Sequence, residues 1–346
     1  MINEGRVLLL AGAEQDLATL PEGCWIGGTV GYFVTPKGGV TAQDVLFYTD
    51  FTKLADGAAW RSFDANNIHE IAQFYPENGF ALLLLPGFSE ILGEVAGRIM
   101  EYEGLYNVPL MGWVSAVAME GMPKILPRGG PKIFAGGPSA ESERAAVLYV
   151  SLPPRCFAQL HIANLFMPGD GPDIKFLEPD LYNAKDCLIG GTRQNLAHYM
   201  AAQNLDRRLP LVADHEGALL NLSILRRDAR AGCVSFLAPV STSLTYRFAE
   251  SVTDYPAEFL HATADIDLHQ AAHSCICMLH YFFAGLDNAP GPRDTKKLRL
   301  PGPPIVAPVT FGQIAYTILN QTLTSLTIGL GEDVFEDLPD AGDDRL

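Results

Sequence analysis

Histidine and cysteine side chains, which are frequent ligands of zinc and of haem iron, are concentrated between residues 269 and 280. The apolar character of Leu268–Phe283 predicts a helix there. On a helix, four donors fall on one face: His269, His273, Cys277 and His280. Because only adjacent donors can reach one ion, His273 and Cys277 are candidate ligands of a metal or of haem, with His269 as an alternative ligand. The alternative is a buried helix with small thiols and hydrogen-bonded histidines.

A second group of polar residues follows a predicted strand over Leu209–Ala213. Ends of strands in open α/β sheets are where ligands usually bind, and Asp214 or Glu216 with His215 can do acid–base chemistry. Asp214 and His215 are therefore candidate residues of a ligand site. A polar turn is the alternative, because no complete nucleophile motif accompanies these residues.

Two glycine pairs are weaker candidates for ligand contact. Trp25, Gly27 and Gly28 belong to a stretch where a ligand can approach the backbone closely. Gly190-Gly191-Thr192-Arg193 precedes a predicted helix, Gln194–Gln203, so an anion can bind at its N-terminus with help from Arg193. Neither matches a dinucleotide or phosphate-loop spacing, and turn or bulge glycines explain both equally well.

Composition restricts the partners. The 346 residues include 40 acidic and 24 basic side chains, and the resulting charge of −16 disfavours nucleic acid. The N-terminal apolar run Val7–Ala13 is too short to cross a membrane, and no convincing signal peptide surrounds it. We therefore expect a cytoplasmic protein without membrane insertion. The charged fraction of 18% is low, which indicates a homo-oligomer or a protein partner.

Alternating strand and helix patterns predict an α/β (α+β) fold, with mixed sheets flanked by helices. Phe80–Leu85 is a predicted buried strand, and Ser89 is the expected N-cap of the next helix. Trp25–Thr35 and Asp44–Thr49 are expected to pair as a hairpin. A further helix is expected over Phe311–Leu326.

The two parts of the chain repeat one outline, in which a helix leads through a short turn into a Pro-Leu strand start. This predicts two similar halves, residues 1–152 and 153–330, with a boundary in the turn Leu152-Pro153-Pro154-Arg155. Residues 331–346 are acidic and poor in apolar side chains, so we expect a disordered tail.

The order of several motifs resembles the FIST family of bacterial ligand-sensing proteins. The similar stretches are Trp25–Thr29, Phe80–Phe88, Pro109–Gly112, Asn183–Tyr199, Ser274-Cys275 and Val309–Ile314. Gln313 stands where the family usually has glutamate, and the arginine that commonly follows the cysteine motif is missing. The resemblance implies a FIST-N-like first half and a FIST-C-like second half. A binding module of this type implies a ligand-binding cleft between the halves, bordered by Asp214, His215, Asn221 and the Cys275 region. It also implies a sensory role in signal transduction through a separate partner, with haem as the ligand of some members.

Three classes of function follow from these patterns: a FIST-type small-molecule sensor, a haem or metal protein, and an enzyme using Cys275 or an acid–base pair in the cleft. The lack of a complete catalytic signature in the sequence favours binding over catalysis.

Overall fold

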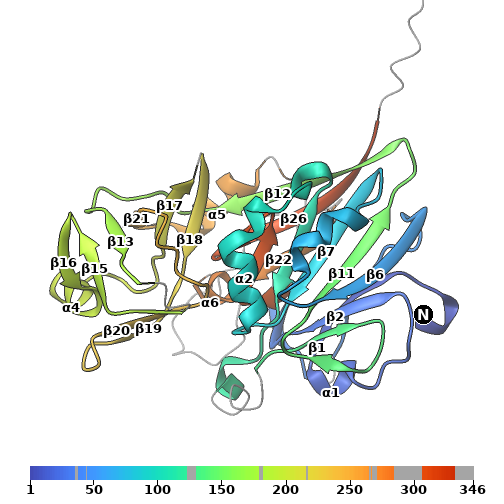
Figure 1. Cartoon of the computed structure of the whole chain (residues 1–346), viewed down its shortest axis with the longest axis horizontal. Coiled ribbons are helices and arrows are strands. Elements are labelled where there is room, and N and C mark those ends of the chain that lie inside the picture. Colours follow the sequence, from blue (N-terminus) through green and yellow to red (C-terminus); the bar gives the residue numbers. More distant parts are fainter. Residues whose placement is uncertain are drawn as a thin grey trace, which may run out of the picture.

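The computed structural model describes residues 1–331 except 36–37, 44, 123–129, 179–181, 216, 265, 267–270 and 284–305. Figure 1 shows two lobes, a larger one built on three sheets and a smaller one built on two. The smaller lobe is formed by residues 169–248. The chain enters and leaves it at neighbouring points, because Pro168 and Ala249 form an isolated antiparallel bridge.

Three mixed sheets form the larger lobe. The first has the order β10 (Ala140–Glu141), β9 (Ile133–Ala135), β2 (Trp25–Thr29), β1 (Leu8–Gly12), β5 (Phe47–Asp50). The second has the order β25 (Ile318–Leu319), β24 (Gly312–Ala315), β8 (Leu110–Val114), β7 (Gly79–Leu85), β11 (Ala145–Ser151), β6 (Gly57–Phe63). The third has the order β12 (Cys156–Asn164), β26 (Thr322–Leu330), β22 (Ala271–Cys277), β23 (Ala307–Thr310), β3 (Tyr32–Thr35), β4 (Gly38–Thr41).

Two antiparallel sheets form the smaller lobe. One has the order β16 (Thr192–Asn195), β15 (Asp186–Ile189), β13 (Ile174–Phe176), β21 (Tyr246–Phe248), β17 (Leu211–His215), β18 (Ala218–Leu222). The other has the order β14 (Asn183–Ala184), β20 (Cys233–Phe236), β19 (Ile224–Asp228).

Helices are short and few among the described residues. The α-helices are α1 (Glu14–Leu17), α2 (Glu90–Arg98), α4 (Leu196–Ala202), α5 (Tyr255–Thr263) and α6 (Met278–Phe283). Single turns of 3-10 helix are η1 (Ile2–Glu4), η3 (Ile99–Glu101), η4 (Leu105–Asn107) and η5 (Met119–Gly121), and η2 (Ile68–Phe74) is longer. The predicted α+β class, with mixed sheets and flanking helices, is confirmed.

The apolar run of β7 is buried along its whole length. It pairs in parallel with β8 and antiparallel with β11, so both of its edges are occupied and both faces pack on core side chains. Strands buried on both faces have continuous rather than alternating apolar sequences, which is why this run was recognisable. The turn after β7 leads into α2, where the Ser89 side chain accepts a hydrogen bond from the Leu92 amide, as expected of an N-cap.

The helix predicted over Leu268–Phe283 is wrong. Its described part is strand β22 followed by the short helix α6. β22 lies between β23 and β26 in the third sheet, so its backbone hydrogen bonds are made to other strands. Pairing partners distant in the sequence thus override the apolar pattern, which does not distinguish a buried strand from a buried helix.

Three other expectations are corrected. The helix expected over Phe311–Leu326 is strands β24, β25 and the start of β26. Trp25–Thr35 does not form a hairpin with Asp44–Thr49. Its second strand, β3, pairs with β4, and the strand that overlaps Asp44–Thr49, β5, pairs with β1. The helix expected over Gln194–Gln203 begins at Leu196 as α4 and is capped by Asn195, because Gln194 belongs to β16.

Strands from both sides of residue 152 share two of the large sheets. β24 and β25 join strands β6, β7, β8 and β11, and β3 and β4 join strands β12, β22, β23 and β26. The predicted boundary therefore falls in the short connection between β11 and β12, within the larger lobe.

Within the described residues, none of the helices has the length and apolar character needed to cross a membrane. The predicted acidic tail spans residues 331–346, and all of it except Gly331 lies outside the described residues.

Candidate functional site

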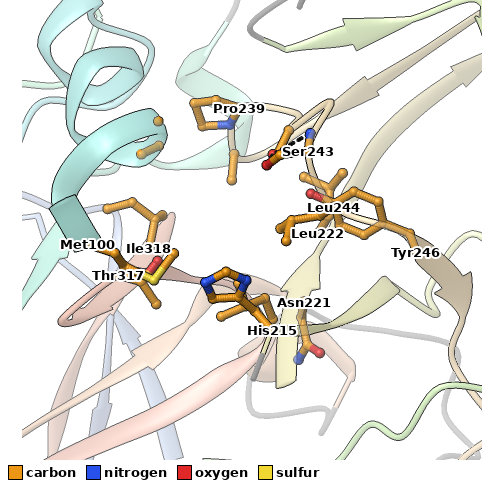
Figure 2. A pocket seen from close by; sticks show the side chains of 15 residues that line it. Met100, His215, Asn221, Leu222, Pro239, Ser243, Leu244, Tyr246, Thr317 and Ile318 are labelled. Atoms are coloured by element: carbon orange, nitrogen blue, oxygen red, sulfur yellow. Dashed lines mark hydrogen bonds between the residues drawn. The ribbon is translucent and has the colours of Figure 1, made fainter. Parts of the chain in front are cut away.

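A cleft of about 100 Å³ lies where the two lobes meet (Figure 2). The larger lobe contributes α2, the turn after it and the turn between β24 and β25. The smaller lobe contributes the end of β17, strand β18, the loop before β21 and the first residue of β21. The lining residues are Ala96, Gly97, Met100, His215, Leu220, Asn221, Leu222, Ala238, Pro239, Ser241, Ser243, Leu244, Tyr246, Thr317 and Ile318.

His215 enters the cleft because of strand alternation. Leu211 and Ala213 of β17 are buried, and His215 is the next residue on the same face of that strand. The side chain therefore leaves the core at the point where the cleft opens. Figure 2 shows the imidazole between the side chains of Ile318 and Leu222.

Asp214 faces the other way and is exposed. Its Oδ1 accepts a hydrogen bond from the Gly217 amide at 2.8 Å, which stabilises the turn between β17 and β18. Asp214 is therefore a turn residue that helps to hold His215 in place, and it does not form an acid–base pair with it. Glu216 lies outside the described residues.

Asn221 contributes to the wall of the cleft, but its amide points away from it (Figure 2). The Asn221 Nδ2 donates to Asn164 Oδ1 at 2.9 Å and to the Asn320 carbonyl at 3.1 Å. Next to it, the Ser223 hydroxyl donates to Gln321 Oε1 at 2.7 Å. These buried polar groups hold β18 and the residue after it, in the smaller lobe, against β12 and the turn between β25 and β26 in the larger lobe.

Replacing Asn221 by alanine is expected to lower the free energy of unfolding by about 2–3 kcal/mol, because the side chain is buried and its partners would lose their hydrogen bonds. Urea denaturation followed by circular dichroism measures the change. Asn66→Ala, at an exposed position just before η2, is the matched control. Equal losses for the two variants would contradict this account of the lobe junction.

Four further polar side chains line the cleft. The hydroxyls of Ser241 and Ser243 are hydrogen-bonded to each other at 2.8 Å, and Thr317 follows Tyr316, which has a left-handed backbone (φ 58°). Burial raises the pKa of Tyr246 to about 12, so its phenol is neutral. None of the described residues that line the cleft carries a fixed charge.

The remaining candidate residues on β22 lie in the core. Cys275 is fully buried, with its sulfur 3.0 Å from Thr324 Oγ1, and burial raises its pKa to about 12. Such a thiol is not a nucleophile. His273 and Cys277 lie four residues apart on the same strand, about 13 Å at the usual rise, so they cannot ligate one ion. His269 lies outside the described residues, within which no group of three or more metal-ligating side chains is present.

The glycine sites are also structural. Trp25, Gly27 and Gly28 are in β2, which is buried and paired on both edges. Gly190 and Gly191 have φ of 57° and 82° and form the two-residue turn between β15 and β16, which explains the glycines without an anion. Arg193 is exposed on β16 and pairs with Asp186 at 3.2 Å.

Of the predicted cleft residues, the structure places only His215 with its side chain in the cleft. Sequence reasoning missed Met100, Leu244 and Ile318, because they lie far apart in the chain and look like ordinary core residues. The signal that identified His215 was its position at a strand end. Two wider hollows, about 460 Å³ beside Tyr102 and about 330 Å³ beside Trp60, lie on the larger lobe and contain none of the predicted residues.

The fold and the site define a two-lobed α+β protein with a small cleft between its lobes, whose described lining carries no fixed charge. The chain belongs to DUF6976, a family of unknown function, whose model matches residues 1–329. No curated protein and no solved structure matches the chain.

Proposed function

We propose that this protein binds a small organic molecule in the inter-lobe cleft and serves as a sensory protein that acts through a separate partner. The supporting observation is that the imidazole of His215, which has no hydrogen-bond partner among the described residues, faces a cleft built from both lobes. Clefts between lobes, with apolar walls and a few polar groups, are typical ligand sites. The sensory role is supported by the FIST-like order of motifs in the sequence.

Ligand-detected NMR with a library of organic molecules of about four to ten heavy atoms tests the binding proposal. Ala96→Leu, on the α2 face of the cleft, is expected to abolish or strongly weaken binding because it fills the cavity. Ala201→Leu makes the same substitution at an exposed position of α4 and should leave binding unchanged. The proposal fails if no library member binds, or if the bound members are indifferent to Ala96→Leu.

A further inference from the structure

We infer that the ligand of the inter-lobe cleft is an uncharged molecule with a short apolar body and one hydrogen-bonding end. This inference rests on the proposed function and names the chemical class of the ligand.

The charge of the ligand is limited by the lining. An ion that leaves water requires a counter-ion or several hydrogen bonds, and its desolvation is otherwise costly. No lysine, arginine, aspartate or glutamate occurs among the fifteen described residues around the cleft. A carboxylate would also meet the field of a protein with charge −16, and an ammonium ion would find no carboxylate among the described lining residues.

The shape of the ligand follows from where the polar groups lie. The side chains of Met100 and Ile318 form one apolar wall, and those of Leu222 and Leu244 face them from the smaller lobe (Figure 2). The imidazole of His215 lies between these walls and offers both a donor and an acceptor nitrogen when neutral. A ligand that is apolar along its length can pack against the two apolar walls. A hydroxyl or amide at its other end can then form a hydrogen bond with the imidazole of His215.

Volume restricts the size. A cavity of about 150 Å³ in another protein holds a benzene molecule. The cleft here has about 100 Å³, two thirds of that volume, so it fits an apolar body of about four heavy atoms. This volume is well below the range of about 300–1,000 Å³ usual for drug-sized ligands.

Four probes of nearly equal size test the inference: 1-butanol, butyramide, butyrate and butylammonium. Dissociation constants are measured with the full chain at pH 7.5 by NMR titration. Butanol or butyramide is expected to bind at least about tenfold more tightly than either ion. His215→Ala should weaken binding of the neutral probe, whereas His69→Ala, at an exposed position outside the cleft, should not.

A charge placed in the lining provides a second, independent measurement. Thr317 is half-buried at the cleft, and Thr317→Asp is expected to raise the affinity for butylammonium and to lower that for butanol. Equal or tighter binding of butyrate or butylammonium by the unmodified protein overturns the inference while the proposed function stands. The inference is also overturned, and the proposed function still stands, if the NMR screen finds that only charged members of the library bind. If nothing binds in the cleft, the proposed function itself fails.

Discussion

Gly112→Ala is expected to prevent folding or to lower the free energy of unfolding by more than about 4 kcal/mol. Gly112 lies in β8 opposite Leu83 of the parallel strand β7. A methyl group on Gly112 would lie 1.8 Å from the Leu83 carbonyl oxygen and 2.9 Å from the Leu83 nitrogen. Both atoms belong to the backbone of a fully buried strand, so neither can move without breaking the pairing of β7 with β8 and β11.

Urea denaturation monitored by circular dichroism measures the loss, and failure to obtain folded protein counts as the expected effect. Gly171→Ala is the matched control, because its added methyl group meets no atom within 4 Å. We expect that variant to remain within about 0.5 kcal/mol of the unmodified protein. A Gly112→Ala protein as stable as the control would show that β7 and β8 are not packed as described.

The second large effect expected is a loss of stability between about pH 6.5 and pH 4.5, before most carboxylates titrate. His273 and His280 are buried, with exposed fractions of 3% and 1%, and burial lowers the pKa of each to about 3. His273 stacks on Trp113, and its Nδ1 is hydrogen-bonded to Thr49, whereas its Nε2 has no partner among the described residues. His280 packs on Phe166 and Tyr255, and neither of its nitrogens has a partner in the described part of the chain.

The sign follows from proton binding. Below about pH 6.5 the unfolded chain protonates both imidazoles, whereas the folded protein keeps them neutral until about pH 3. Folding stability is therefore fully present above about pH 6.5 and falls as the pH decreases. The slope approaches about 1.4 kcal/mol per pH unit for each histidine. Carboxylates whose pKa is lowered by hydrogen bonds, such as Asp206 beside Arg208, add to this loss only at lower pH.

Urea denaturation at half-unit intervals from pH 7.5 to 4.5 gives the slope. His273→Gln and His280→Gln are each expected to remove about half of it, whatever their effect at neutral pH. The control is His69→Gln, which removes an imidazole that is exposed to water in the folded and the unfolded chain. A flat profile for the unmodified protein would mean that the two buried histidines do not stay neutral.

The parts of the fold that the sequence predicted are those with local signals. The apolar run of β7 and the cap at Ser89 depend on neighbouring residues, and both were recognisable. The segments at β22 and β26 were misassigned because an apolar stretch of that length suits a helix or a buried strand equally. Only the pairing of β22 with β23 and β26 decides between them. His215 was recognisable because it lies at the end of a strand. Asn221 was predicted as a cleft residue, and only its hydrogen bonds to Asn164 and Asn320 show that its amide holds the lobes together instead.

The order of strands in the large sheets has a consequence for synthesis on the ribosome. Strand β26 lies between β12 and β22, and β24 covers the edge of β8, yet both belong to residues 312–330. Until these residues emerge, the early strands of the larger lobe have unpaired edges and uncovered apolar faces, which invite aggregation. The smaller lobe has all its strands within residues 174–248 and can pair them sooner. A nascent chain that needs chaperone protection until its last strands are made is therefore expected, with the inter-lobe cleft completed only when the turn at Thr317 docks.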